Sequence, residues 1–151
     1  MRKIVVFLAT GFGLGLVPFA PGTAGSILGL GLAMSFCMMG LWWQIPLAIV
    51  LSVIAIPICG VAEEYYGKQD DRRIVADEIL TFPLCLLGIP WMEHPTILII
   101  AFVMNRILDI IKPPPARQAQ NLYGGIGIVM DDVFSSLYAL GINWLVFRLI
   151  Y

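Results

Sequence analysis

Five apolar runs alternate with polar, turn-rich segments along this chain, and the alternation restricts the fold more than any other feature. The runs cover about residues 26–40, 46–62, 78–91, 96–111 and 131–149. Only 13% of the residues are charged, against roughly 25% in a soluble domain. We therefore predict an all-α membrane bundle of about five apolar helices, formed as a single domain over residues 1–151.

Positive charge gathers on one predicted side of the bundle. If successive helices cross alternately, the segments 10–26, 63–77 and 112–131 share that side, and only Arg148 lies at the other end. The positive-inside rule then places the polar side in the cytoplasm. Several runs are short for a hydrocarbon core of about 30 Å, so tilted or re-entrant helices are expected among them. The cations on the polar side are Arg2, Lys3, Lys68, Arg72, Arg73, Lys112 and Arg117, with Arg106 one or two turns inside.

Several classes of function are excluded or disfavoured by composition. The net charge is −1, so no basic field indicates a nucleic-acid partner. Cys37, Cys59 and Cys85 are isolated in apolar runs, which is typical of buried free thiols. The single histidine, His94, falls on the opposite side, so no Ser-His-Asp or Cys-His site is expected. The short apolar segment 4–9 is interpreted as a retained segment.

Acidic residues collect at the predicted helix ends on the polar side. Asp77 and Glu78 begin the third run, and Asp131 and Asp132 precede the fifth. Each pair alone is also compatible with simple stabilisation of a helix N-terminus. If the ends pack together, however, the like charges need a counter-ion, and Mg²⁺ prefers oxygen ligands. The candidate acids are Glu63, Asp77, Glu78, Asp109, Asp131 and Asp132.

Two further features are compatible with an anion site. Residues 10–26 read TGFGLGLVPFAPGTAGS, and such a turn before a helix exposes backbone N–H groups to an anion. Thr23 or Ser26 is expected to cap that helix, and a re-entrant turn is the alternative. Arg106, Asp109 and Lys112 share a helix face at i, i+3 and i+6. They form either an ion pair at the membrane edge or two phosphate anchors beside a carboxylate.

Three blocks of sequence carry a resemblance to a known family. They are residues 10–26, AEEYYGKQDDRRIVADE at 62–78, and RILDIIKPPPARQAQNLYGGIGIVMDD at 106–132. Together they resemble the phosphatidylglycerophosphatase A family over nearly the whole chain. The resemblance implies Mg²⁺-dependent hydrolysis of the terminal phosphate of phosphatidylglycerophosphate at the cytoplasmic face of the bacterial inner membrane. The chain departs from the usual family pattern at Asp71, Thr81 and Gln120.

The resemblance and the residue chemistry together yield a set of expected roles. The mechanism has either water or an aspartate as nucleophile, with Asp70, Asp109 or Asp132 as the base. The metal ligands are expected among Glu63, Asp77, Glu78 and Asp131, with Asp132 as a further helper. The substrate-binding residues are expected to be Thr10, Gly22, Thr23, Ser26, Arg106 and Lys112. The catalytic residues are expected among Asp77, Glu78, Asp109, Asp131 and Asp132.

Three alternatives stay open at the level of sequence. One is a phosphatase for another lipid phosphate, such as phosphatidic acid. A second is a small membrane transporter subunit, although its acids would be expected at the membrane midplane and not at helix ends. A third is a lipid-binding protein whose acids only cap helices. The sequence does not specify an oligomeric state.

Overall fold

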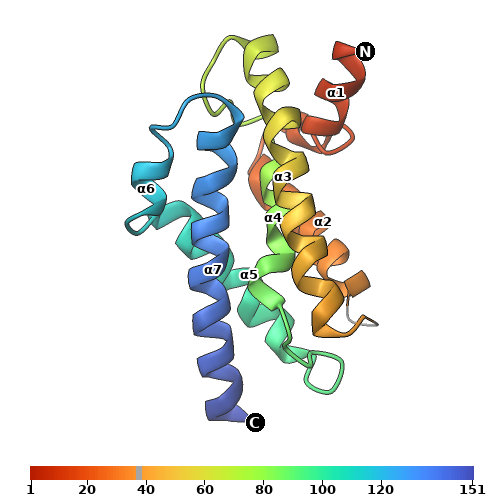
Figure 1. The fold of residues 1–151 in the computed structure, drawn as a ribbon, viewed down its shortest axis with the longest axis vertical. Coiled ribbons are helices and arrows are strands. Elements are labelled where there is room, and N and C mark those ends of the chain that lie inside the picture. Colours follow the sequence, from red (N-terminus) through yellow and green to blue (C-terminus); the bar gives the residue numbers. More distant parts are fainter. Residues whose placement is uncertain (37–38) are drawn as a thin grey trace.

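The computed structural model describes residues 1–36 and 39–151, and every regular element in this part of the chain is helical. Figure 1 shows an elongated bundle with the long helices α3 and α7 along its axis and shorter helices beside them. The all-α prediction is confirmed. In chain order the elements are α1 (Arg2–Ala9), the 3₁₀ segment η1 (Leu14–Leu16), α2 (Pro21–Ser35), α3 (Leu41–Tyr66), α4 (Ala76–Thr81), the 3₁₀ segment η3 (Phe82–Leu86), α5 (Thr96–Ile111), α6 (Ala116–Ala119) and α7 (Gly125–Ile150).

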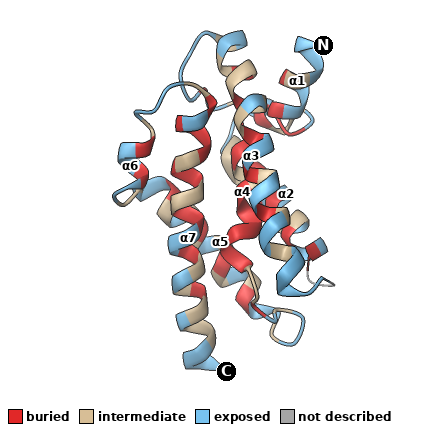
Figure 2. Ribbon diagram, viewed as in Figure 1, coloured by how far each residue is buried: buried red, intermediate tan, exposed pale blue. Residues whose placement is uncertain are grey.

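Two of the described helices, α3 and α7, are long and apolar enough to cross a membrane. Each has 26 residues, or about 39 Å at 1.5 Å per residue. Their outer faces carry exposed apolar side chains, such as Val53 at 58% and Leu149 at 76% exposure, and Figure 2 shows that burial is confined to the inner faces. We expected about five apolar helices, some of them too short to span. Only these two described helices have the length and hydropathy of a span, since α2 and α5 have 15 and 16 residues.

The third apolar run is a broken helix in the centre of the bundle. We expected one helix over 78–91, but α4 ends at Thr81 and a 3₁₀ segment continues to Leu86. Pro83 explains the break, because it has no N–H group to continue the hydrogen-bond ladder. Phe82 and Cys85 in this segment are fully buried. The run therefore supplies the core against which the long helices pack.

The remaining boundaries move by several residues. The fourth run matches its prediction, since α5 covers Thr96–Ile111. Helix α3 extends the predicted 46–62 at both ends, and Pro46 lies inside it. Helix α7 begins at Gly125 and not near residue 131, so Asp131 and Asp132 lie in its second turn. A capping role for this acidic pair is therefore wrong.

Helix α2 begins earlier than predicted. We expected a helix over 26–40, but α2 begins at Pro21 and has no side-chain cap. The expected capping by Thr23 or Ser26 is wrong, because both residues lie inside the helix. Proline suits the first helical position, where its fixed φ is already helical and its missing N–H costs nothing.

Glycines allow two very close helix contacts. A Cβ atom at Gly29 of α2 would lie 2.6 Å from the Cβ of Phe82 and 2.9 Å from the carbonyl oxygen of Glu78. A Cβ atom at Gly125 of α7 would lie 2.0 Å from the carbonyl oxygen of Ile56 in α3. Small residues at such crossings let backbones approach one another, as in membrane helix pairs. The first contact places the middle of α2 against α4, and the second places the start of α7 against α3.

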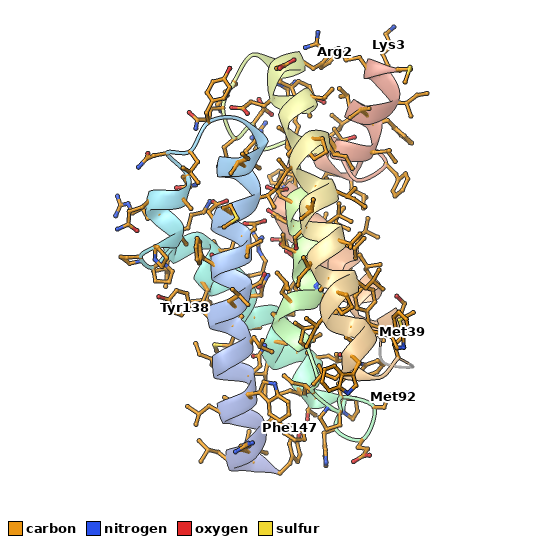
Figure 3. All side chains as sticks on the ribbon, in the orientation of Figure 1. Arg2, Lys3, Met39, Met92, Tyr138 and Phe147 are labelled. Atoms are coloured by element: carbon orange, nitrogen blue, oxygen red, sulfur yellow. The ribbon has the colours of Figure 1, made fainter. Side chains whose placement is uncertain are left out.

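The two ends of the bundle differ in their connections. Figure 1 places the N-terminus, the α3–α4 connection and the α6–α7 connection at one end, and the α4–α5 connection and the C-terminus at the other. In Figure 3, Arg2 and Lys3 lie at the first end and Met92 lies toward the second. The predicted grouping of loops agrees with this arrangement, whereas the side of the membrane stays a prediction.

The cysteines follow the prediction where they are described. Cys59 and Cys85 are buried free thiols in the hydrophobic core. Cys37 lies outside the described residues.

Candidate active site

A polar cavity of about 410 Å³ lies where the start of α2, the start of α4, the end of α5 and the second turn of α7 meet. These elements are far apart in sequence, and their polar side chains converge on this one space. Thr10, Ser26 and Glu63 from the predicted site do not line it. The predicted residues that do are Gly22, Thr23, Asp77, Glu78, Arg106, Asp109, Lys112, Asp131 and Asp132.

Negative charge exceeds positive charge in the lining. The three cations are Arg72, Arg106 and Lys112. With all of these groups ionised, the cavity carries a formal charge of −3, since six acids face three cations. Such an excess of negative charge favours the binding of a further cation. The six acids are Asp70, Asp77, Glu78, Asp109, Asp131 and Asp132.

Arg106 connects three elements at the base of the cavity. Its Nη1 donates to Oδ2 of Asp109 at 2.8 Å, within α5. The same nitrogen lies 3.3 Å from Oε1 of Glu78 in α4 and donates to Oγ of Ser26 in α2 at 3.1 Å. The side chain of Arg106 is only 17% exposed. The guanidinium is therefore held in place by partners from α2, α4 and α5.

Glu78 lies directly against the backbone of α2. A Cβ atom at Gly22 would lie 2.2 Å from Oε1 of Glu78, and one at Gly25 would lie 2.9 Å from Oε2. Burial raises the pKa of Glu78 to about 7, although the charge of Arg106 opposes this shift. A carboxyl group with such a pKa can hold or release a proton near neutral pH.

Two buried carboxylates carry oxygens without hydrogen-bond partners. These atoms are Oδ1 of Asp77 and Oδ2 of Asp132. Burial, followed by the negative charges of Glu78 and Asp70, raises the pKa of Asp77 well above its usual range. An orphaned buried carboxylate oxygen is costly unless a proton or a cation satisfies it.

The donor chemistry of the cavity fits Mg²⁺, a hard cation that takes carboxylate oxygens as ligands. The two orphaned oxygens and the excess of negative charge both agree with such an ion. Within the described residues, no group of three or more His, Cys, Asp and Glu side chains is arranged so that it could hold a metal ion. The fit therefore rests on the donor set and not on an assembled coordination shell.

Lys112 pairs with a carboxylate on the facing helix. It ends α5 in a left-handed backbone conformation with φ of 49°. Its Nζ donates to Oδ2 of Asp131 in α7. Burial alone would lower the pKa of Lys112, but the hydrogen bond and the charge of Asp131 outweigh burial, and the pKa is raised. The ammonium group stays charged and joins the end of α5 to α7.

The first turn of α2 forms one wall of the cavity. Pro21, Gly22 and Thr23 line it. The N–H groups of a first helical turn have no partner within the helix, and the helix dipole makes this end attractive to anions. In this turn Pro21 has no N–H group, which leaves the amides of Gly22 and Thr23 as possible donors.

The three predicted residues outside the lining have other surroundings. Oγ1 of Thr10 donates to the carbonyl oxygen of Phe7 at 3.0 Å and accepts from the N–H of Gly13 at 3.2 Å, which shapes the turn after α1. Ser26 is fully buried and also donates to Oε2 of Glu78 at 3.5 Å, so its hydroxyl group contacts both Glu78 and Arg106. Glu63 lines a neighbouring pocket.

Two charged lining residues did not appear among the sequence-based site residues. Asp70 was considered only as a possible base, and Arg72 only as part of the charge asymmetry. Two acids and two cations follow one another at Asp70-Asp71-Arg72-Arg73, so the sequence is compatible with several ion pairs. The path of the backbone decides which of these side chains face the cavity. No periodic pattern in the sequence distinguishes them.

The fold and the cavity together define a class. This is an all-helical protein with two helices long and apolar enough to cross a membrane, and it carries a cavity rich in carboxylates with three cations in its lining.

Comparison with known proteins gives the family. The family model of phosphatidylglycerophosphatase A matches residues 7–147. A phosphatidylglycerophosphatase A of Escherichia coli K12 is 34% identical over 142 residues, covering 92% of this chain and 81% of the relative. The corresponding protein of Haemophilus influenzae is 35% identical, covering 88% of this chain and 82% of the relative. The chain belongs to the phosphatidylglycerophosphatase A family and is a phosphatase.

A third relative carries a different name. A putative phosphatidylinositol-3-phosphatase of Bacteroides thetaiotaomicron is 36% identical over 143 residues, covering 89% of this chain and 87% of the relative. No solved structure matches the chain.

Proposed function

We propose that this chain hydrolyses the terminal phosphomonoester of phosphatidylglycerophosphate, which yields phosphatidylglycerol and inorganic phosphate. The observation that carries the proposal is the cavity in which carboxylates, two partly buried cations and a helix N-terminus converge. The names of the relatives from Escherichia coli and Haemophilus influenzae support the substrate. The two apolar helices and the loop charges support a location in the bacterial inner membrane with the site on the cytoplasmic side.

The phosphoryl group is bound by the positive side of the cavity. Arg106 and Lys112 neutralise its oxygens, and the first-turn amides of Gly22 and Thr23 donate to them. These groups are fixed before substrate arrives, because Arg106 and Lys112 already contact partners on neighbouring helices. Preorganised donors of this kind stabilise the charge that shifts onto the equatorial oxygens in the transition state.

The negative side of the cavity binds a divalent cation in this proposal. Asp77, Glu78, Asp131 and Asp132 are the ligands, and Asp77 and Asp132 each contribute an oxygen that lacks a partner. When bound, Mg²⁺ supplies Lewis-acid polarisation and charge neutralisation at the phosphoryl group. Glu63 becomes a ligand only after a rearrangement, because it lines the adjacent pocket.

Water is the nucleophile that the cavity supports best. Asp70 or Asp109, neither of which is a ligand in this proposal, takes a proton from the water, whose oxygen forms a bond to phosphorus. The bond between phosphorus and the glycerol oxygen breaks, and that oxygen takes up a proton as phosphatidylglycerol leaves. The protonated carboxyl group that the base has become can return this proton.

The first experiment replaces one carboxylate on each side of the cavity. Asp77→Asn and Asp131→Asn should each lower phosphate release from phosphatidylglycerophosphate by about 10²-fold or more, in the range for loss of a group that stabilises a transition state. Activity should vanish in EDTA and return with Mg²⁺. Glu93→Gln, at the opposite end of the bundle, is the matched control and should keep wild-type activity. Near-normal turnover in both cavity variants would remove this site from the reaction.

A second candidate substrate has one specific observation in its favour. The relative from Bacteroides thetaiotaomicron is named for a phosphoinositide, so a phosphatase for another lipid phosphate is the alternative. Phosphate release from phosphatidylglycerophosphate, phosphatidic acid and phosphatidylinositol 3-phosphate, measured side by side in the same mixed micelles, separates the candidates. A higher kcat/KM for either of the last two would replace the proposed substrate.

A further inference from the structure

The segment after α3 divides its side chains between two environments. Asp70, Arg72 and Ile74 line the cavity. Asp71 and Arg73, which alternate with them, pair with each other instead. Nε and Nη2 of Arg73 donate to the two carboxylate oxygens of Asp71 at 2.7 and 2.9 Å. Asp71 and Arg73 therefore form hydrogen bonds with each other on either side of Arg72. This pairing holds the backbone at Arg72, whose side chain lines the cavity.

The outer side of this segment is fixed by a second contact. The guanidinium carbon of Arg73 lies 3.7 Å from the centroid of the Tyr66 ring at the end of α3. A cation at this distance over an aromatic face is attracted by the ring. The N–H of Arg73 also donates to Oδ1 of Asp71 at 3.0 Å. Arg72 is therefore flanked by an anchored residue and does not belong to a free loop tip.

Arg72 differs from the other two cations in the lining. Arg106 and Lys112 are partly buried and bound to carboxylates. Arg72 is exposed and makes no ion pair within the described part of the chain. Its neighbour Asp70 is engaged elsewhere, because Oδ2 of Asp70 accepts from Nε2 of Gln120 at 3.5 Å. Arg72 thus supplies the cavity rim with positive charge that no carboxylate neutralises.

The chemistry of the substrate calls for a second anion subsite. Phosphatidylglycerophosphate carries two phosphates joined through one glycerol, and only the terminal one reacts. With the terminal phosphate at the partly buried cations Arg106 and Lys112, the phosphodiester must lie farther out along the cavity. The exposed Ile110 lines another part of the rim, which suits the apolar part of a lipid. A guanidinium binds phosphate oxygens in a fork geometry that an ammonium cannot reproduce.

We propose that Arg72 forms a rim subsite that binds the non-reacting phosphodiester of the lipid substrate and so sets the preference for lipids with two phosphates. This inference rests on the proposed function. The subsite contributes to substrate binding and does not touch the phosphorus that reacts. Arg72 is therefore a specificity-determining residue and not a catalytic one.

The test measures steady-state kinetics of the full-length protein in detergent micelles with Mg²⁺. Arg72→Gln should raise the KM for phosphatidylglycerophosphate about tenfold, the loss expected for one charge-assisted hydrogen bond. The value of kcat should change much less, because the diester is bound equally in the ground and transition states. Inorganic phosphate, which lacks a diester, should inhibit wild type and Arg72→Gln with the same inhibition constant. Arg117→Gln, which removes an exposed cation outside the cavity lining, is the matched control.

Each other outcome overturns the proposal. An unchanged KM in Arg72→Gln would make Arg72 a solvated surface residue. A fall in kcat, or weaker inhibition by inorganic phosphate, would place Arg72 at the reacting phosphate. An equal rise in KM for Arg117→Gln would indicate a general electrostatic effect. Failure of the proposed function is distinct, because the wild-type protein itself would then not hydrolyse phosphatidylglycerophosphate.

Discussion

At the scale of single residues, the cations Arg106 and Lys112 of the cavity are stabilised by hydrogen bonds and ion pairs with neighbouring side chains. One nitrogen of Arg106 contacts Ser26, Glu78 and Asp109, and Lys112 binds Asp131 across two helices. An unpaired buried charge would be strongly unfavourable, whereas a paired and hydrogen-bonded one is tolerated. The same pairing fixes both cations in position before a phosphate arrives. Lysine is a poor substitute for Arg106, because an ammonium cannot span the same set of partners with fixed planar geometry.

The ion pair of Asp71 and Arg73 should make stability depend on pH. The hydrogen bond from Arg73 lowers the pKa of Asp71 below its usual value, so the folded state favours the ionised carboxylate. The resulting stabilisation is present above the unfolded pKa of about 3.9 and is lost as the pH falls through the lower folded pKa. Asp71→Asn should therefore lower the thermal midpoint at pH 7. The difference from wild type should shrink in melts taken toward pH 3.

An exposed ion pair provides the control for this prediction. Glu64 and Arg2 lie 3.7 Å apart with side chains that are 76% and 55% exposed. Such a pair contributes little to stability, so Glu64→Gln should melt like wild type at every pH. A pH-independent difference between Asp71→Asn and wild type would contradict the role of the carboxylate charge.

At the scale of elements, the contact between α2 and α4 depends on glycine. A Cβ atom at Gly29 would meet three fixed groups: the Cβ of Phe82 at 2.6 Å and the carbonyl oxygens of Glu78 and Ile79 at 2.9 and 3.1 Å. None of these can swing aside, so Gly29→Ala should push α2 away from α4 at a cost of about 1–3 kcal/mol. The separation should also disturb Glu78 at the cavity. We expect a lower thermal midpoint and reduced phosphate release.

The same helix offers a matched control. A Cβ atom at Gly31 would meet nothing within 4 Å, and alanine favours a helix over glycine by about 1 kcal/mol. Gly31→Ala should therefore leave activity intact and keep or raise the thermal midpoint. Equal behaviour of the two variants in a melt would show that helix propensity, and not the contact with α4, governs this face of α2.

A buried polar pair aligns α5 and α7, which together with Lys112 at the end of α5 supply five of the nine charged side chains of the cavity. Oγ of Ser136 in α7 donates to Oδ1 of Asn105 in α5 at 3.1 Å, and both side chains are buried. Asn105 immediately precedes Arg106, and Ser136 lies one turn after Asp132. In an apolar interior such a hydrogen bond favours one register over others. The pair therefore connects the packing of α5 on α7 to the geometry of the cavity.

The elements were only partly predictable from the sequence. The apolar runs identified helices in the right places, and α5 matched its prediction because Pro95 and Pro113 bound it on both sides. The start of α7 was missed because Gly125 and Gly127, which are poor helix formers in isolation, are required there by contact with other backbone. Likewise the break at Phe82 follows from Pro83, whereas hydropathy alone continues the run.

At the scale of the whole molecule, the site was more predictable than the number of spans. Residues that share a helix face, such as Arg106, Asp109 and Lys112, could be grouped from spacing alone. The positions of α4 and α7 next to that helix face depend on close contacts between helices at glycine residues. No local sequence pattern encodes these contacts. Glu63 illustrates the limit, because it lies at a suitable helix end yet lines the adjacent pocket. Arg72 is the opposite case, because the sequence did not single it out and yet it lines the cavity. Its two neighbours, Asp71 and Arg73, pair with each other.

The arrangement of α3 and α7 makes a prediction about topology. Both helices are long enough to cross the membrane, and the connections at the two ends of the bundle should then face opposite compartments. Tyr123, which is 96% exposed, precedes α7 at the end that also carries Arg2 and Lys3. Glu93 is exposed in the α4–α5 connection at the other end. Because positive loops stay in the cytoplasm, these two positions report on opposite sides.

Single cysteines at these two positions test the topology in a background without the native cysteines. Tyr123→Cys should react with a membrane-impermeant maleimide only in inverted vesicles, and Glu93→Cys only in right-side-out vesicles. This background replaces all three native cysteines by alanine, and neither Cys59 nor Cys85 lines the cavity. Reaction of both cysteines from the same side would mean that the bundle lies along the membrane surface. Reaction from opposite sides in the reverse sense would keep the spanning arrangement but place the cavity outside the cytoplasm, away from any substrate made there.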